Sequence, residues 1–132
     1  MWKTSWGQPK YKNVKITTAD GKFDSKLEYY RWCELLILEK AKKITDLKRQ
    51  VKFVLIDKSK YGREISYIAD FTYKKGDKLI VEDTKSTATK TRLYCLKKRL
   101  VAERYGITIT EIMWWKEKVL YFIARLLNRL KY

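Results

Sequence analysis

The stretch that decides the fold is residues 65–85, which read ISYIADFTYKKGDKLIVEDTK. Its two halves, Ile65–Tyr73 and Leu79–Lys85, are rich in Ile, Val, Tyr, Phe and Thr, the residues that pack best on a pleated sheet. Lys74–Asp77 lies between them and contains the Gly and Asp of a tight turn. The pattern therefore predicts a β-hairpin.

Acidic side chains interrupt both predicted strands of this hairpin. Asp70 lies in the otherwise apolar and aromatic run Tyr67–Phe71, and Asp83 follows the apolar residues of the second strand. Lys85 comes two residues after Asp83, so the two side chains point to the same face of the sheet.

The register of the hairpin decides on which face Asp70 lies. A two-residue turn at Lys75-Gly76, or a four-residue one over Lys74–Asp77, places Asp70 on the face of Asp83 and leaves Glu82 on the other. A three-residue loop would place Asp70 with Glu82 instead. We expect the first register, and a bulge that favours Glu82 is the alternative.

Two carboxylates on one half-buried face suggest a metal site. They repel each other and lose hydration, and a divalent cation relieves both penalties. Mg²⁺ prefers such oxygen ligands and keeps waters and substrate phosphates as further ligands. Lys85 beside them can orient a water or stabilise charge on a phosphate. The alternative is a surface hairpin with an ordinary Asp83–Lys85 ion pair.

A helix over residues 25–42 precedes the hairpin. Ser25 and Glu28 have the spacing of a capping box, which alone accounts for a Glu at this position. A helix packed on the sheet would also bring Glu28 to the same end as Asp70 and Asp83. Glu28 is therefore a candidate third acidic group.

The remaining pattern predicts an α/β domain with a mixed sheet flanked by helices. We expect Ile44–Leu47 to lead out of the first helix and Lys58–Gly62 to form a polar turn. Gly106 should end the second helix. The other expected elements are strands near Val14–Thr17, at Val51–Ile56 and at Ile107–Ile112, a helix over Thr87–Tyr105, and an extra amphipathic helix at 116–131 within the C-terminal segment 113–132.

Length and charge narrow the class of protein. A chain of 132 residues suggests a single domain, 1–132. Lys and Arg number 31 against 15 Asp and Glu, a net charge of +16 that favours a polyanionic partner. No apolar run is long enough for a membrane span, and the first residues lack a signal-peptide core, so we expect a cytoplasmic protein.

The chain contains no His and two Cys. The absence of His excludes zinc fingers with His ligands, HNH nucleases and any His general base. Cys33 and Cys95 each fall in a predicted helix beside apolar residues, and we expect buried, reduced thiols.

Four motifs occur in order along the chain: Phe23–Glu28, Gln50–Phe53, Tyr67–Phe71 and Val81–Lys85. Together they resemble the PD-(D/E)XK nuclease superfamily. The chain is most similar to a family of small phage-encoded proteins in that superfamily, catalogued as a domain of unknown function. It is more distantly similar to phage endonuclease I-type Holliday junction resolvases. The resemblance runs from about residue 10 to 112.

This resemblance implies a restriction-endonuclease-like fold and a metal-dependent endonuclease. Asp70 and Asp83 would bind Mg²⁺ or Mn²⁺ together with a main-chain carbonyl near Thr84. Glu28 would bind or polarise the metal of the attacking water, and Lys85 would assist the nucleophile. Water would attack the phosphate in line and leave a 5′-phosphate. The resolvases further imply branched DNA, a homodimer, the cytoplasm of a bacterial host and no small-molecule cofactor.

The second predicted helix is strongly basic. A seven-residue repeat places Lys90, Lys97 and Arg104 on one face, and the helix follows the Asp83–Lys85 strand directly. We therefore expect phosphate contacts beside the metal site, although a solvated helix face is the alternative. The candidate cations are Lys90, Arg92, Lys97, Lys98, Arg99 and Arg104.

The two ends of the chain leave alternatives open. Residues 1–13 read as a basic aromatic arm whose Trp2, Trp6 and Tyr11 either stack on unpaired bases or belong to a disordered tail. The apolar stripe of helix 116–131 fits its own core, a homodimer or a membrane surface. A non-catalytic basic module that binds DNA or RNA on the same fold is the main rival to an enzyme.

Overall fold

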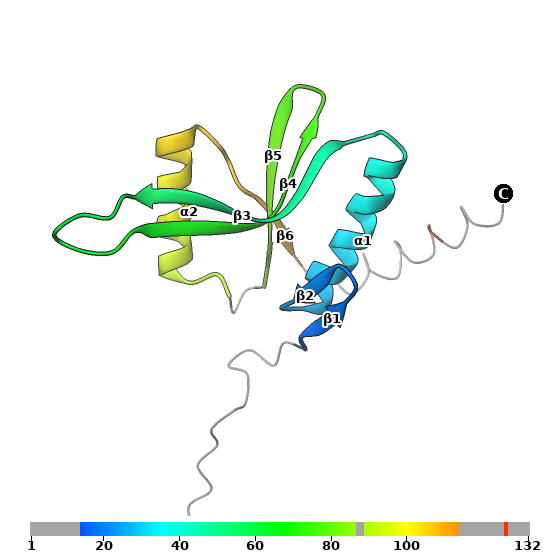
Figure 1. Ribbon diagram of the computed structural model, residues 1–132, viewed down its shortest axis with the longest axis horizontal. Helices are drawn as coiled ribbons and strands as arrows, with labels where there is room; N and C mark the ends of the chain where they lie inside the picture. Colours follow the sequence, from blue (N-terminus) through cyan, green and yellow to red (C-terminus); the bar gives the residue numbers. More distant parts are fainter. Residues whose placement is uncertain (1–13, 87–88, 114–125, 127–132) are drawn as a thin grey trace, which may run out of the picture.

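The computed structural model describes residues 14–86, 89–113 and 126 of the chain. These residues form a mixed α/β arrangement in which α1 and α2 lie on either side of the central strands (Figure 1). The elements are β1 (Ile16–Thr18), β2 (Gly21–Phe23), α1 (Lys26–Lys40), β3 (Thr45–Ile56), β4 (Ile65–Lys75), β5 (Lys78–Lys85), α2 (Arg92–Tyr105) and β6 (Thr110–Met113).

The described strands make two sheets. The larger has the order β3-β4-β5-β6, and the smaller pairs β1 with β2. The pairs β3–β4 and β4–β5 are antiparallel, whereas β6 runs parallel to β5. The parallel pair needs a long crossover, which α2 provides. The expected mixed sheet with helices is therefore confirmed at this level.

The hairpin that decides the fold forms, with its turn one residue later than expected. Lys75 pairs with Lys78, so Gly76 and Asp77 make the two-residue turn, and the φ of 63° at Gly76 suits a residue without a Cβ. The ladder continues to Phe71 opposite Glu82. The pairing is shifted by two residues from the expected one, an even number, so the assignment of faces is unchanged.

Several element boundaries differ from the sequence expectation. β3 begins at Thr45, so Ile44–Leu47 is not a connection, because pairing with β4 extends the strand. The second helix begins at Arg92 rather than at Thr87, with the side chain of Thr91 accepting from Tyr94 N–H. Its end at left-handed Gly106 is confirmed.

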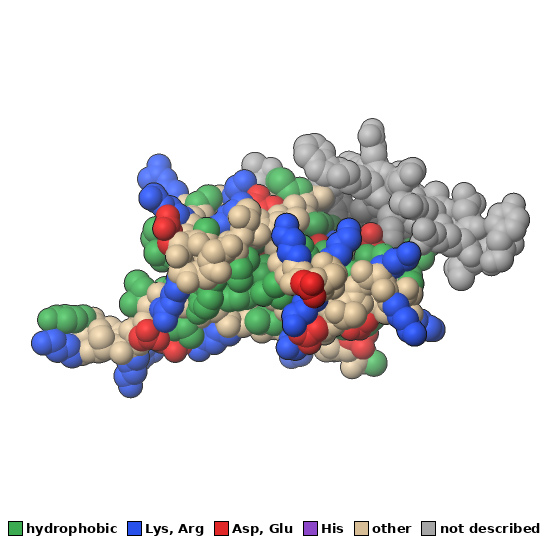
Figure 2. All heavy atoms as spheres, turned by 90° about the horizontal axis from the view of Figure 1, so that it is seen from above, with side chains coloured by type: hydrophobic (Ala, Val, Ile, Leu, Met, Phe, Trp, Pro, Cys, Tyr) green, Lys and Arg blue, Asp and Glu red, His purple; other side chains and the backbone are tan. Residues whose placement is uncertain are grey.

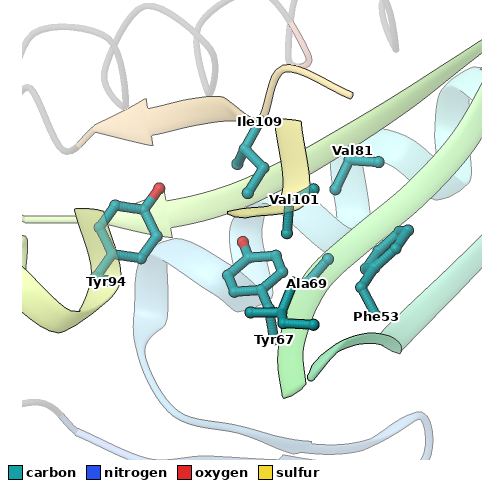
Figure 3. Packing of buried hydrophobic residues seen from close by; sticks show 8 residues of the cluster. Phe53, Tyr67, Ala69, Val81, Tyr94, Val101 and Ile109 are labelled. Carbon is teal, nitrogen blue, oxygen red and sulfur yellow. The ribbon is translucent and has the colours of Figure 1, made fainter. Parts of the chain in front are cut away.

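Strand β4 contributes to two separate cores. Tyr67 and Ala69 pack in the cluster that includes Tyr94 and Val101 of α2 (Figure 3), whereas Phe71 packs against Leu35 of α1. Strict alternation along β4 would place these three β4 residues on one face. The first cluster comprises Phe53, Leu55, Tyr67, Ala69, Val81, Tyr94, Val101 and Ile109, and the second Leu35, Ile44, Phe71 and Tyr73.

The change of core occurs where the β3–β4 ladder is interrupted. Pairs form at Arg49–Phe71 and at Val51–Ala69, with Gln50 and Asp70 between them. Gln50 has a φ of 52°, a left-handed conformation that bends a strand. Asp70 therefore lies where β4 passes from the α2 core to the α1 core.

Neither cysteine is fully buried. Cys33 is half-buried and Cys95 is exposed, so the prediction of two buried thiols is wrong. Cys95 is rotated about 100° from Tyr94, which faces the core.

The N-terminal arm 1–13 lies outside the described residues, as does the helix 116–131 apart from Leu126. No helix among the described residues is long and apolar enough to cross a membrane.

Candidate active site

The structure brings Asp70 and Asp83 together on neighbouring strands. The β4–β5 ladder ends with Phe71 opposite Glu82, so Asp70 and Asp83 are the next two residues along the two strands. Asp83 is 3% exposed, and Asp70 is half-buried.

Asp83 is held by two side chains. The Tyr67 hydroxyl donates to Asp83 Oδ2 over 2.7 Å, and Lys85 Nζ lies 3.0 Å from the same oxygen. Lys85 also lies over the ring of Tyr94, with 4.3 Å from its Nζ to the ring centroid. Burial and the neighbouring Asp83 carboxylate raise the pKa of Tyr67, so its hydroxyl remains a neutral donor.

Asp70 is anchored through the strand that carries Asp83. Its Oδ2 accepts from Thr84 N–H over 2.8 Å and from Thr84 Oγ1 over 2.7 Å. Burial raises the pKa of Asp70 to about 8, and the hydrogen bond and negative charge of Asp83 act in the same direction. A carboxyl whose pKa is raised, beside a second and buried carboxyl, forms the kind of site that a divalent cation stabilises.

Glu82 is excluded from this pair because it points to the opposite face. Its carboxylate accepts hydrogen bonds from Arg31 Nε over 2.8 Å and from Arg31 Nη2 over 2.6 Å. The Tyr73 hydroxyl donates to Glu82 Oε1 over 2.6 Å. With 1% exposure and three donors, Glu82 is a structural anchor between β5 and α1. Of the two candidates, Asp83 is the one beside Asp70.

Glu28 lies in a separate environment at the start of α1. Ser25 caps the helix, since its Oγ accepts from Glu28 N–H over 3.2 Å. The Glu28 carboxylate accepts instead from Asp24 N–H at 2.9 Å, one residue before the position a capping box requires. Its other oxygen accepts from Gln50 Nε2 at 3.2 Å. Burial raises the pKa of Glu28, and the Asp24 N–H opposes that shift.

The third acidic group does not join the first two. Among the described residues, no three His, Cys, Asp or Glu side chains come close enough together to hold a metal ion. The carboxyls of Asp70 and Asp83 nevertheless fit Mg²⁺, which proteins commonly bind through one or two carboxylates, with waters and phosphate oxygens as further ligands. Gln50 links Glu28 to this region, because it lies across the β3–β4 ladder from Asp70.

The basic residues of α2 do not form one uniform face. Tyr94 and Val101 are the buried positions of the helix. Lys97 and Arg104, which are seven residues apart, flank the buried face, whereas Lys90 precedes the helix and does not share that face as expected. The exposed Arg92 and Arg99 lie on the outer side of the helix, and Lys98 is half-buried.

Some of these cations already have acidic partners. Lys90 Nζ and Lys98 Nζ lie 3.0 Å and 2.8 Å from the two carboxylate oxygens of Glu111, which pairs with Asp83 across β5 and β6. Burial opposes the charge of Glu111, but the hydrogen bonds from Lys98 and Lys90 lower its pKa to about 2. Arg104 contacts Asp57 at the far end of α2.

Two contributors to this region were not assigned from the sequence. Tyr67 lies three residues before Asp70 and reaches Asp83 only because β4 changes core between them. Gln50 belongs to a motif that carries the resemblance, but nothing in its residue type announces the left-handed backbone. An aromatic residue in a β-strand ordinarily packs in the core, so the residue type of Tyr67 does not indicate a role at the site either.

Comparisons with known proteins bear on the whole described domain. No curated protein and no solved structure matches the chain. A family model described as a protein of unknown function, DUF1064, matches residues 8–122, which include both strands of the carboxylate pair and the basic helix. The chain therefore belongs to the DUF1064 family.

Proposed function

We propose that this protein is a Mg²⁺-dependent endodeoxyribonuclease on a restriction-endonuclease-like domain. The observation that carries the proposal is that Asp70 and Asp83 both lie just beyond the last pair of the β4–β5 ladder, with Lys85 Nζ 3.0 Å from Asp83. Two acidic groups and a lysine in this order are also what the resemblance to PD-(D/E)XK nucleases implies. The reaction is hydrolysis of DNA phosphodiester bonds.

The metal would be held by Asp70, Asp83 and the main-chain carbonyl of Thr84. Mn²⁺ would serve in place of Mg²⁺, since both prefer oxygen ligands. When bound, the ion neutralises the two carboxylates and makes a coordinated water more acidic. The resemblance also assigns Glu28 as a ligand. Its carboxylate lies beside Gln50 in the structure and would have to approach the metal from there.

Lys85 is the residue that acts on the nucleophile. Its ammonium group, now paired with Asp83, is placed to orient the attacking water and to stabilise negative charge on the phosphate. An O–P bond forms from water as the bond from phosphorus to the 3′ oxygen breaks. The attacking water gives up a proton and the departing 3′ oxygen takes one up, so the products are a 5′-phosphate and a 3′-hydroxyl.

The net charge of +16 supports DNA as the partner. Lys90 and Lys98 bracket Glu111 beside the carboxylate pair, and Arg92 and Arg99 are exposed on the outer side of α2. Selectivity for branched DNA, action as a homodimer and a role in phage recombination in the host cytoplasm follow from the likeness to Holliday junction resolvases. These properties make up the most specific form of the proposal, a Holliday junction resolvase.

The test is cleavage of end-labelled four-way junction, flap, single-stranded and linear duplex DNA in Mg²⁺, Mn²⁺ or EDTA. Asp83→Asn is compared with wild type, and Asp77→Asn in the exposed β4–β5 turn is the matched control. We expect metal-dependent cutting that Asp83→Asn abolishes and Asp77→Asn retains, with the junction cut fastest.

Tight, salt-sensitive DNA binding without cutting in any metal would contradict the enzyme. It would favour the alternative, a non-catalytic basic module that binds DNA or RNA. The uncompensated positive charge of the chain supports that alternative as well, so binding alone does not separate the two proposals. Cutting that survives in Asp83→Asn would place the site elsewhere.

A further inference from the structure

The segment between β3 and β4 forms the end of a projecting arm. Residues 57–64 make the loop at the left of Figure 1, and the same arm extends from the left of the body in Figure 2. Ser59 and Gly62 exchange two backbone hydrogen bonds, of 3.1 Å and 3.2 Å. Lys60 and Tyr61 therefore form the apex of an ordered turn.

The arm presents positive charge that no described residue neutralises. Its acidic residues are engaged elsewhere, because Asp57 pairs with Arg104 of α2 and Glu64 pairs with Lys52 of β3. The exposed cations Lys58, Lys60 and Arg63 form no ion pair with the described residues. A cluster of this kind attracts phosphate groups.

Tyr61 contributes little to the packing of the domain. Its side chain is 87% exposed, the highest value among the exposed large hydrophobic residues. Lys60 Nζ lies 5.0 Å from the centroid of its ring. An exposed aromatic ring with a cation beside it and further cations in the same loop is suited to stacking on a nucleobase while the cations contact the flanking phosphates.

We propose that the β3–β4 arm is a second nucleic-acid contact, in which Tyr61 stacks on an unpaired base and Lys58, Lys60 and Arg63 bind the adjoining phosphates. The choice of nucleic acid as the partner rests on the proposed function. Ile65 is about 17 Å from Asp70 along β4, taking ~3.4 Å per residue. This distance corresponds to about five base-pair steps of duplex, taking ~3.4 Å per step, so the arm lies well away from the bond at the Asp70–Asp83 site.

The experiment measures binding of the full chain in EDTA, so that no strand is cut. The probes are a fluorescein-labelled 20-nucleotide dT strand and a 20-base-pair duplex, followed by anisotropy over a range of salt concentrations. The variants are Tyr61→Ala, Tyr61→Phe, Lys58→Ala and Arg63→Ala. The control is Lys78→Ala, which removes an exposed cation next to the turn of the other hairpin.

We expect Tyr61→Ala to weaken binding of the single strand about tenfold, the loss of one stacked base, and Tyr61→Phe to bind like wild type. The duplex, which offers no unpaired base, should lose less than twofold. Lys58→Ala and Arg63→Ala should each reduce the slope of log affinity against log salt by about 0.7 on the single strand, and Lys78→Ala should not.

Two results would overturn the arm contact. One is a Tyr61→Ala variant that binds the strand like wild type, and the other is a slope that falls equally in Lys78→Ala. Failure of the proposed function is distinguishable from either, since it is read from cleavage. A chain that cuts DNA with an indifferent arm refutes this inference alone, and a chain that binds through the arm without cutting refutes the nuclease alone.

Discussion

The Tyr67 hydroxyl of β4 donates to Asp83 Oδ2 of β5 over 2.7 Å. Strand β4 packs in the core of α2 before Asp70 and in the core of α1 after it. Lys85 shares the same oxygen at 3.0 Å. One carboxylate oxygen thus has a neutral and a charged partner. This arrangement fixes the direction of the Asp83 side chain before any ligand arrives.

Replacing Tyr67 by Phe should weaken metal binding without removing any ligand. The ring keeps its place in the core with Phe53 and Tyr94, but Asp83 loses the donor that orients it. Loss of such an outer partner typically reduces metal affinity 10- to 100-fold, so we expect about tenfold for Mn²⁺. Calorimetric titration measures this change, and Tyr61→Phe at an exposed position is the control. Unchanged Mn²⁺ affinity would refute the positioning role of Tyr67.

Lys85→Met should reduce the rate of cleavage while DNA binding persists. An unbranched apolar side chain of similar length is kept, but the charged group that orients water and stabilises phosphate charge is lost. Such positioned groups contribute roughly 10²- to 10⁴-fold, so a loss of about 10²-fold or more is expected in single-turnover cleavage. Lys78→Met, at the exposed first residue of β5, should cleave at the wild-type rate. Equal rates for Lys85→Met and wild type would remove Lys85 from the reaction.

Asp70→Asn should stabilise the metal-free protein and make it insensitive to Mn²⁺. Above pH 8, where Asp70 is ionised, the change removes a half-buried negative charge next to Asp83 while keeping an acceptor for Thr84 N–H. Wild type should instead gain about 2.7 kcal/mol at a Mn²⁺ concentration 100 times the dissociation constant. Thermal unfolding in EDTA and in Mn²⁺ compares the two, with Asp77→Asn as the control. A Mn²⁺-induced shift that persists in Asp70→Asn would contradict the site.

Glu82→Gln should unfold the domain more readily rather than impair a ligand. Glu82 is 1% exposed and forms a two-point hydrogen-bonded pair with Arg31. Breaking a buried pair of this kind costs about 3 kcal/mol, because Arg31 loses its buried charged partner and keeps only the half-buried Glu34. Urea denaturation gives the value. A Glu82→Gln protein as stable as wild type but inactive would return Glu82 to the list of ligands.

The stability of the β6 edge should depend on acid pH through Glu111. Its pKa is lowered from 4.5 to about 2 in the folded state, so the contribution is present above pH 4.5 and is lost as pH falls toward 2. The pairs with Lys90 and Lys98 are partly exposed, and we expect about 1 kcal/mol. The stability difference between wild type and Glu111→Gln, measured by urea denaturation from pH 7 to pH 2.5, should shrink across this window. A constant difference would contradict the assignment.

Features that depend on neighbouring residues were predictable from the sequence. The Ser25 cap, the Gly106 helix end and the face shared by Asp83 and Lys85 follow from local spacing, and all three occur. The turn of the hairpin was misplaced by one residue, and the face of Asp70 survived because an even shift keeps the alternation.

Features that depend on packing were not predictable in this way. No local pattern announces that Arg31 of α1 binds Glu82, 51 residues away, or that this pairing removes Glu82 from the candidate ligands. The extension of β3 to Thr45 likewise depends on its pairing with β4. Glu28 had two sequence interpretations, and its observed bond to Asp24 N–H is a third arrangement.

The passage of β4 through both cores has a consequence for how the domain responds to damage. Asp70 lies at the junction, so a cavity made near Leu35 in one core or Val101 in the other acts on the same strand. Loosening either helix then shifts Asp70 relative to Asp83. The geometry of the carboxylate pair therefore depends on the packing of both cores, and many substitutions far from the pair should first change the distance between Asp70 and Asp83.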